Sequence, residues 1–372
     1  MTAVALVVGA GPAGLAAAVR LAGSCDSVTV VDAQARESRR RVGEHLPPSG
    51  LSELATIGLR MLIDDDRHEP SPGVRSCWGE GAVVDKEYFS GLPGYGLNLR
   101  REAFDEALAL HAERQGATLC FSTRLQRLDP DAHGYCATLQ SATETRRLQA
   151  DILVDATGRH AAAARRLGAR RRRFDHAVAL IGNLANCRSV PEVGRVHIES
   201  VEDGWWYGVP YANGDMLCTL VTDAANLRRG PDAGRALWRA RLRTSRLLGL
   251  VAASGDLPER IAVCDAATQW LEYPCLPGFL AVGDAAAAYD PLSSWGITKA
   301  LADGDAGARA LVLDRAGDTR ALRAHRHKQL RELIDHRARQ HAFYSAETRW
   351  SASQFWRSHR TGTPTAAAVT GG

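Results

Sequence analysis

Near the N-terminus the sequence runs Val4-Ala-Leu-Val-Val-Gly9-Ala-Gly11-Pro-Ala-Gly14. The apolar residues at its start are typical of a parallel strand that is buried on both faces. Glycines with the spacing GxGxxG follow, and an alanine-rich helix is expected from Pro12 to about Ala22. A second apolar run, Ser27–Asp32, completes the order strand, turn, helix, strand. This stretch therefore predicts a βαβ unit of the kind found in dinucleotide-binding domains.

The three glycines have separate tasks in such a unit. Gly9 permits the tight turn, Gly11 lets a pyrophosphate approach the backbone, and Gly14 lets the helix pack closely on the strand. The phosphates then lie at the positive end of the helix dipole. Asp32 ends the second strand 18 residues after Gly14, where a carboxylate can bind ribose hydroxyls. The unit predicts a bound dinucleotide and leaves both NAD and FAD open.

Later segments favour FAD. Asp155-Ala-Thr-Gly158-Arg159 closes an expected buried strand over 151–156, which is a typical way for a second segment to meet the adenosine half of FAD. Phe279-Leu-Ala-Val-Gly283-Asp284 ends another strand with a carboxylate placed for the ribityl chain. Asp290-Pro291-Leu-Ser-Ser294-Trp-Gly296-Ile297 then opens a helix, whose N-terminus would stabilise negative charge on a reduced flavin. Together these segments predict a flavin site.

Composition excludes several classes of function. The chain has 372 residues, a length that favours two connected domains. Its formal net charge is only +4 and is carried almost wholly by arginine, so nucleic acid binding is not indicated. Cysteine and histidine show no metal-type spacing, and no metal site is predicted. No apolar run is long enough for a membrane span, and a cytoplasmic location is expected.

The predicted fold is α/β. It combines a three-layer, Rossmann-like FAD-binding domain with an inserted antiparallel β-sheet domain that faces the substrate, followed by C-terminal helices. Arg235–Leu250 is expected to form one amphipathic helix, and 320–350 one or two polar helices. The predicted bounds are 1–75, 96–175 and 266–320 for the FAD-binding domain, 76–95 and 176–265 for the substrate domain, 321–360 for the C-terminal helices and 361–372 for a disordered tail.

With these motifs the chain resembles the two-domain flavoproteins of the para-hydroxybenzoate hydroxylase and flavin-dependent halogenase superfamily, from residue 2 to about 360. Other segments resemble a narrower, LodB-like group, whose flavoproteins hydroxylate peptidyl tryptophan while tryptophylquinone cofactors are made. The segments that carry this second resemblance are Arg41-Val-Gly-Glu44-His-Leu-Pro-Pro48, Asp203-Gly-Trp205-Trp-Tyr207, Asp290-Pro-Leu-Ser-Ser294 and Arg349-Trp350 with Phe355-Trp356.

The resemblance implies a FAD-dependent monooxygenase. A flavin C4a-hydroperoxide formed with O₂ would hydroxylate an electron-rich aromatic ring, expected to be indole or tryptophan, either free or within a precursor protein or peptide. Electrons would come from NAD(P)H or from a separate reductase. Three alternatives stay open: a FAD-dependent dehydrogenase or reductase, a flavin-dependent halogenase of a secondary metabolite, and a binding protein that has lost its flavin.

Motifs and resemblance together give a set of cofactor-binding candidates. They are Gly9, Gly11, Pro12, Ala13, Gly14, Asp32, Arg41, Glu44, Arg100, Asp155, Gly158, Gly283, Asp284, Pro291, Ser294, Gly296 and Ile297.

The catalytic candidates are His45, Trp205, Tyr207 and Pro291. His45 is either a general base, for which an imidazole pKa is suited, or a hydrogen-bonded structural histidine. Because side chains alternate along a strand, Trp205 and Tyr207 share one face and Trp206 takes the other. The shared face is either a packing surface between domains or a wall of the substrate pocket.

Two basic features have open interpretations. Flavin-dependent tryptophan halogenases carry a lysine that handles hypohalous acid, and Lys86 is the only lysine between the motifs of this chain. Its charged neighbours predict an exposed loop. The run Arg170–Arg173 is either a solvated surface or a docking patch for an acidic protein or peptide.

Overall fold

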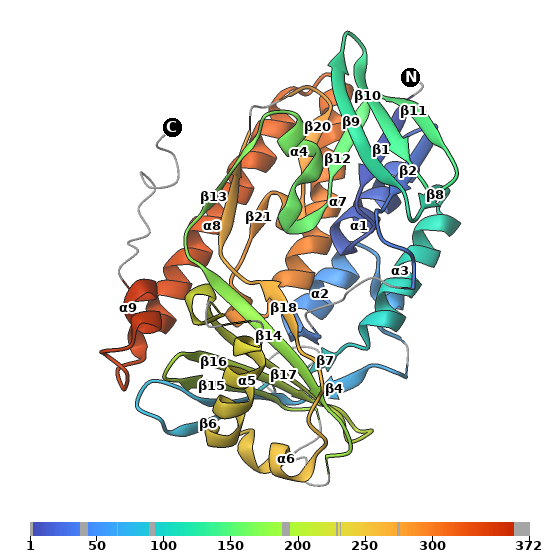
Figure 1. Ribbon diagram of the computed structural model, residues 1–372. Coiled ribbons are helices and arrows are strands. Elements are labelled where there is room, and N and C mark those ends of the chain that lie inside the picture. Colours follow the sequence, from blue (N-terminus) through green and yellow to red (C-terminus); the bar gives the residue numbers. More distant parts are fainter. Residues whose placement is uncertain are drawn as a thin grey trace.

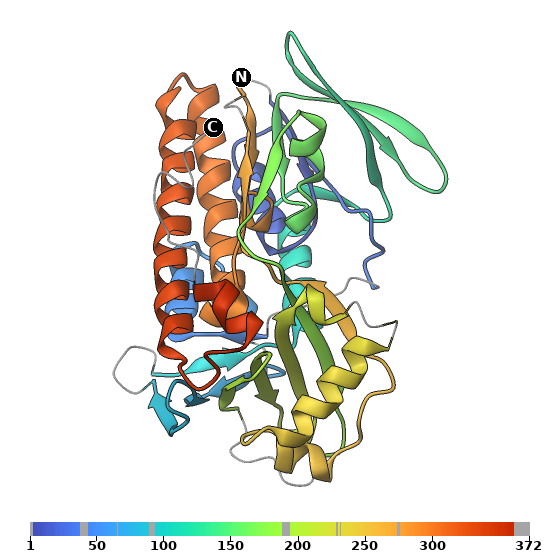
Figure 2. The ribbon, with the colours of Figure 1, turned by 60° about the vertical axis from the view of Figure 1, so that its left-hand side comes forward.

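The computed structural model describes residues 3–37, 44–64, 66–88, 94–187, 194–227, 230, 232–273 and 276–360. A parallel sheet with its helices occupies one end of the molecule, and a second, larger sheet occupies the other (Figure 1). Helices α7 Gly296–Arg315 and α8 Arg320–Ala346 run side by side along the first part, as Figure 2 shows from another direction.

The parallel sheet is built around the predicted βαβ unit. Its strand order is β20-β12-β1-β2-β8, and all neighbouring pairs are parallel. The strands are β1 Val4–Val8, β2 Ser27–Val31, β8 Ala117–Cys120, β12 Ile152–Asp155 and β20 Phe279–Ala281. The strands expected from the sequence motifs are therefore confirmed. Since the C-terminal ends of parallel strands share one edge, the three motif-bearing turns come together there.

Two layers cover this sheet, because side chains alternate between its faces. On one face Val7 and Val30 pack with α1 Pro12–Ala22, α3 Arg101–Arg114 and α7. On the other face Leu6 and Val31 pack against an antiparallel sheet. The strands of that sheet are β9 Arg124–Asp131, β10 Gly134–Gln140 and β11 Thr145–Ala150. This arrangement confirms the predicted three-layer fold class.

The larger sheet has the order β18-β14-β17-β16-β15-β5-β6. Its pairs are antiparallel, as predicted, except for the parallel pair of β15 with β5. The hairpin β5–β6 comes from an earlier part of the chain and joins the sheet beside β15 in the same direction. The strands are β5 Gly73–Cys77, β6 Val83–Glu87, β14 Ala177–Leu184, β15 Val196–Val201, β16 Gly204–Pro210, β17 Met216–Asp223 and β18 Ala262–Asp265. The domain bounds themselves stay a prediction.

One predicted helix is in fact two, α5 Ala233–Thr244 and α6 Gly249–Ser254. The carboxylate of Glu199 on β15 accepts hydrogen bonds from Ser245 Oγ at 2.6 Å and from the backbone N–H groups of Arg246 and Leu247 at 2.8 and 2.9 Å. These bonds compete with the helical ladder and end α5 at Thr244. Residues 320–350 contain one helix, α8, which ends at Ala346.

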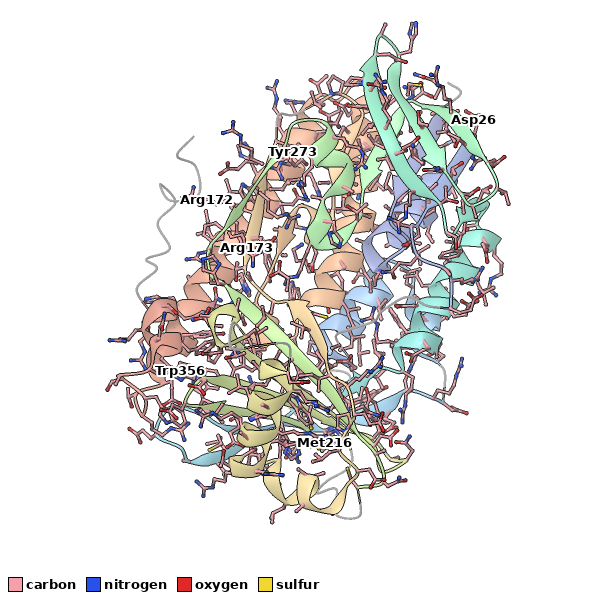
Figure 3. All side chains as sticks on the ribbon, viewed as in Figure 1. Asp26, Arg172, Arg173, Met216, Tyr273 and Trp356 are labelled. Carbon is pink, nitrogen blue, oxygen red and sulfur yellow. The ribbon has the colours of Figure 1, made fainter. Side chains whose placement is uncertain are left out.

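The arginine run is strand β13 Arg170–Arg173, which pairs with β19 Gln269–Glu272. Arg171 Nη2 donates to the carbonyl oxygens of Asp284 and Ala285 at 3.1 and 2.8 Å. Arg172 and Arg173 lie next to each other at the edge of the molecule (Figure 3). The run is therefore partly solvated, as one interpretation held, but Arg171 also holds the segment that follows β20.

The remaining elements are short and connect these parts. They are β3 His45–Leu46, α2 Pro48–Thr56, η1 Arg60–Ile63, β4 Glu69–Ser71, β7 Gly96–Asn98, η2 Gly158–His160, α4 Ala162–Arg166, η3 Ala224–Leu227, η4 Gly283–Ala285, β21 Ala287–Ala288, η5 Pro291–Ser293 and α9 Gln354–Arg360. Among the helices of the described ranges, none has the length and apolar character needed to cross a membrane. The predicted disordered tail, 361–372, lies outside the described residues.

Candidate active site

A cavity of about 430 Å³ lies between the motif-bearing turns and the larger sheet. On one side it is lined by the N-terminal ends of α1 and α7 and by the segments that follow β12 and β20. On the other side it is lined by residues of β14, β16, β17 and β18, mostly apolar or aromatic. The cavity thus joins the predicted dinucleotide site to a face of the predicted substrate sheet.

The glycine turn has the features that a bound pyrophosphate requires. Gly9 has a φ of 105°, and a Cβ there would collide with the Ala156 carbonyl. A Cβ on Gly14 would collide with the carbonyl oxygen of Gly9, so the helix lies directly against the turn. Gly11 faces the cavity, and a Cβ there would meet no atom within 4 Å. Free space at the N-terminus of α1, which has no acidic residue in its first turn, fits an anionic group.

Asp32 and Asp155 hold the backbone around the turn. Asp32 Oδ2 accepts a hydrogen bond from the N–H of Ala10 at 2.8 Å. Asp155 is fully buried and accepts hydrogen bonds from the Thr157 hydroxyl and the Ala164 N–H, both at 2.7 Å. Burial raises the pKa of Asp155. Neither residue is among the described residues that line the cavity, and the ligand contacts predicted for them stay predictions.

Arg159 ties the second motif to the third. Its Nη2 donates to the carbonyl oxygen of Tyr289 at 2.9 Å, and its Nη1 donates to that of Ala267. Its Nε lies 3.6 Å from Asp284 Oδ2. Arg159 lines the cavity together with Gly158 and Asp284. Arg159 belongs to the second motif but is not among the predicted site residues.

A buried ion-pair cluster supports the Gly283 turn. The backbone N–H of Gly283 donates to Asp303 Oδ2 at 2.6 Å, and Lys299 Nζ donates to the Gly283 carbonyl oxygen at 2.9 Å. His325 Nε2 lies 3.0 Å from Asp303 Oδ1. Burial alone raises the pKa of Asp303, but His325 and the charge of Lys299 outweigh it and hold that pKa well below its ordinary value. Lys299 also lines the cavity, and the prediction missed it.

The loop between β21 and α7 forms the next part of the wall. Asp290 caps η5 through a hydrogen bond from the Leu292 N–H at 2.8 Å, and burial raises the pKa of its carboxyl to about 6. Four predicted residues from this region line the cavity: Pro291, Ser294, Gly296 and Ile297. The first turn of α7 has no acidic residue, so no carboxylate of the helix itself neutralises its positive end.

Aromatic side chains of β16 form the opposite wall. Trp205 and Tyr207 line the cavity, whereas Trp206 packs against Trp238 on the other face of the sheet at 5.7 Å between ring centroids. The predicted alternation is therefore confirmed. Trp205 is fully buried, and its Nε1 donates to the hydroxyl of Tyr344 at 2.8 Å. Burial, and then the nearby charge of Glu44, raises the pKa of Tyr207 well above its ordinary value.

His45 lies in the cavity wall beside Glu44, with both ring nitrogens in hydrogen bonds. Nδ1 is 3.0 Å from Asn98 Oδ1, and Nε2 is 3.0 Å from the hydroxyl of Tyr88. The Asn98 amide nitrogen donates to the Gly194 carbonyl oxygen at 2.7 Å, which turns its oxygen toward His45. Nδ1 then donates and Nε2 accepts, as in a neutral imidazole. Burial lowers the pKa of His45 to about 4. This geometry favours the structural interpretation.

The low pKa of His45 predicts an acid-sensitive fold. The pKa of histidine in an unfolded chain is near 6.5. Between that pH and about pH 4, His45 therefore binds a proton in the unfolded chain but stays neutral in the folded chain. The contribution of His45 to stability should be full above pH 6.5 and fall by about 3 kcal/mol as the pH drops toward 4, while His336, whose pKa burial also lowers, adds to the slope of wild type and variant alike. Urea unfolding at a series of pH values measures this slope. His45→Gln should flatten it, and an unchanged slope in that variant would contradict the assignment.

Two predicted cofactor residues remain. Arg41 lies outside the described residues. Arg100 donates to Glu69 Oε1 at 3.0 Å and stacks over the Tyr211 ring, whereas its neighbour Arg101 lines the cavity. Arg100 is therefore not among the described residues that line the cavity, and the cofactor contact predicted for it stays a prediction. Within the described parts of the chain, no group of three histidine, cysteine or acidic side chains is placed to hold a metal ion.

Comparison with known proteins places this geometry in a family. The profile of the FAD binding domain family matches residues 1–329. The chain is 28% identical over 359 residues to the putative FAD-dependent oxidoreductase LodB of Marinomonas mediterranea, which covers 95% of each protein. It is also 28% identical to the tryptophan 2-halogenase of Chondromyces crocatus, over 80% of this chain and 58% of the halogenase.

A solved structure shares the fold. The peptidyl tryptophan dihydroxylase QhpG, described as essential for tryptophylquinone cofactor biogenesis, superposes with a TM-score of 0.77 at 24% identity and covers 97% of this chain and 79% of its own. The chain belongs to the FAD binding domain family and is a FAD-dependent oxidoreductase of the monooxygenase and halogenase superfamily.

Proposed function

We propose that this flavoprotein hydroxylates an electron-rich aromatic ring, with the indole of a tryptophan residue in a polypeptide as the favoured substrate. One observation carries the proposal: a single cavity joins the glycine turn and the α7 N-terminus to the aromatic face of β16. When bound, reduced FAD supplies the two electrons with which one atom of O₂ enters the ring and the other leaves as water.

The protein's own groups would then bind, orient and exclude water. The N–H groups at the start of α1 would bind the pyrophosphate, and the start of α7 would stabilise negative charge on the reduced ring. The apolar side chains of Ile181 and Val221, with Trp205 and Tyr207, would hold an aromatic substrate and keep water out. A role for His45 as a general base stays a prediction. The Tyr88 hydroxyl already forms a hydrogen bond with Nε2, the ring nitrogen that would have to accept the proton.

The substrate proposal draws on likeness to other proteins. The LodB relative aligns over 95% of both chains, and the QhpG fold belongs to a protein described as acting on peptidyl tryptophan.

Labelled oxygen gives a direct test of the proposed reaction. Photoreduced protein is mixed with ¹⁸O₂ and a tryptophan-containing peptide, and the peptide is examined by mass spectrometry. Incorporation of ¹⁸O into the indole supports the proposal. Oxidation of a substrate without oxygen, with turnover under anaerobic conditions, would instead identify a dehydrogenase or reductase. Anaerobic mixing with NADH and NADPH shows whether either reduces the flavin directly or whether a reductase must do so.

Halogenation is the second candidate, because the tryptophan 2-halogenase is a relative and Lys299 lines the cavity. Lys86 is an unsuitable halogenase lysine, since it lies exposed on the edge strand β6. Lys299 Nζ is in turn engaged with the Gly283 carbonyl, and it lies 4.9 Å from the centroid of the Tyr289 ring. Repeating the labelled-oxygen experiment with chloride or bromide present distinguishes the two reactions. Formation of a halogenated indole would show that the reaction is halogenation and not hydroxylation.

Asp284 is expected to hold the ribityl chain of FAD. Its side chain lines the cavity and is 38% exposed, so we expect Asp284→Ala to weaken FAD binding by about 1.5 kcal/mol, or roughly tenfold. Asp284→Asn keeps the shape and one acceptor, and should lose less. Flavin fluorescence titration of the apoproteins measures both. Equal affinity in Asp284→Ala and wild type would place the ribityl chain elsewhere.

A further inference from the structure

Buried hydrogen bonds link the two walls of the cavity through a residue outside it. Trp205 Nε1 donates to the hydroxyl oxygen of Tyr344 at 2.8 Å, and that hydroxyl donates to Asp290 Oδ2 at 2.7 Å. Asp290 Oδ1 accepts from the N–H of Leu292 at 2.8 Å. Trp205 and Tyr344 are fully buried, and Asp290 is 1% exposed. One hydroxyl thus bonds to the β16 wall and to the residue that caps the Pro291 loop.

The ring of Tyr344 is fixed by the C-terminal helices. It lies near the end of α8, where it stacks on His359 at 5.0 Å and meets Trp356 at 5.6 Å and Trp78 at 6.2 Å between ring centroids. Trp356 Nε1 donates to the Val201 carbonyl oxygen at 2.9 Å, which anchors α9 to the larger sheet. Figure 3 shows Trp356 where α9 meets that sheet. The hydroxyl is therefore held from outside the cavity with little freedom.

This contact lies beyond the part of the chain that the family profile covers. The profile matches residues 1–329, and α8 carries Tyr344 past that range. The Tyr344 hydroxyl has a hydrogen bond to each wall, and all three side chains are buried. If the hydroxyl were removed, the Trp205 N–H and the Asp290 carboxylate would each lose this bond, and the bonds would no longer hold the two walls at a fixed separation.

We propose that Tyr344 is a positioning residue, which sets the separation between the Trp205 wall and the Pro291–Ser294 loop and so aligns the aromatic substrate with the flavin. The part that concerns the substrate rests on the proposed hydroxylation. Tyr344 does not line the cavity among the described residues, so it acts through Trp205 and Asp290. Misalignment lets reduced flavin and O₂ yield FAD and hydrogen peroxide instead of hydroxylated product and water.

Tyr344→Phe removes the hydroxyl and keeps the ring. Tyr135→Phe is the matched control, because the Tyr135 hydroxyl donates to the Pro277 carbonyl oxygen at a similar 2.7 Å in the layer of β10, away from the cavity. Both FAD-saturated variants are photoreduced and mixed with O₂ and the tryptophan peptide. We expect the ratio of hydroxylated peptide to peroxide to fall about tenfold in Tyr344→Phe and to stay unchanged in Tyr135→Phe. Equal ratios in wild type and Tyr344→Phe would overturn the proposal.

A second measurement needs no substrate and separates this proposal from the proposed function. The absorption spectrum of oxidised, bound FAD responds to the surroundings of its ring, and we expect it to change in Tyr344→Phe and not in Tyr135→Phe. If wild type hydroxylates nothing, the proposed function fails while this comparison still stands. Identical spectra in all three proteins would contradict the positioning role.

A conservative variant covers the case in which Tyr344→Phe does not fold. Replacing Tyr344 by para-aminophenylalanine keeps a donor toward Asp290 and weakens the acceptor for Trp205. Its product-to-peroxide ratio, or its flavin spectrum when no product forms, should depart from wild type in the direction expected for Tyr344→Phe. A value equal to that of wild type would count against the proposal.

Discussion

The Gly11→Val variant is expected to fold normally and to lose FAD. A Cβ at Gly11 meets no atom within 4 Å, so the apoprotein has room for the new side chain. The same space faces the cavity at the α1 N-terminus, where a pyrophosphate must come close to the backbone. We expect FAD affinity to fall at least about 100-fold, or ~2.7 kcal/mol. Titration of the apoprotein with FAD measures this loss.

The stability of the Gly11→Val apoprotein serves as its internal control. Its urea midpoint should match that of the wild-type apoprotein. Gly23→Ala at the other end of α1, where the nearest atom to a new Cβ is 3.9 Å away, should keep both stability and FAD. Wild-type FAD affinity in Gly11→Val would show that the phosphates lie elsewhere.

The Gly14→Ala variant is expected to lose stability, whereas the Gly11→Val variant is expected to lose FAD. Its Cβ would overlap the carbonyl oxygen of Gly9, a backbone atom that cannot move without opening the turn. Because overpacking of this kind typically costs 1–3 kcal/mol even where side chains can adjust, we expect a loss of at least about 3 kcal/mol. Denaturant unfolding of the apoprotein measures the loss.

Gly11→Ala, three positions earlier, adds the same methyl group to open space and provides the matched comparison. It should leave the unfolding free energy of the apoprotein unchanged. Similar stabilities in the two alanine variants would mean that α1 does not lie against the turn as described.

The motif-bearing turns on one side of the cavity were predictable because their signals are local. The glycine spacing, the apolar strands and the carboxylates that follow them lie within short segments, and parallel strands bring their ends together at one edge. The alternation of Trp205, Trp206 and Tyr207 is likewise a property of any strand. These features can be predicted without knowing which distant residues are in contact.

Most of the missed features depend on pairs far apart in the sequence. Glu199 interrupts the helix predicted over 235–250 from 46 residues away, and the periodicity of that segment carries no trace of it. Tyr344 reaches Asp290 across 54 residues, from a helix expected to be merely polar. Lys299 had a weak signal, since it follows the predicted start of α7 and has Asp303 one turn later. Its burial could not be inferred from that spacing.

We propose that one cavity holds both the flavin and the aromatic substrate. A crystal structure of the protein with FAD and a tryptophan peptide tests it most directly. We predict the pyrophosphate at Gly11 and the start of α1, with the isoalloxazine ring beside the Pro291 loop and the indole between that ring and the Trp205–Tyr207 face. A flavin ring turned away from this face, or an indole bound outside the cavity, would contradict the claim.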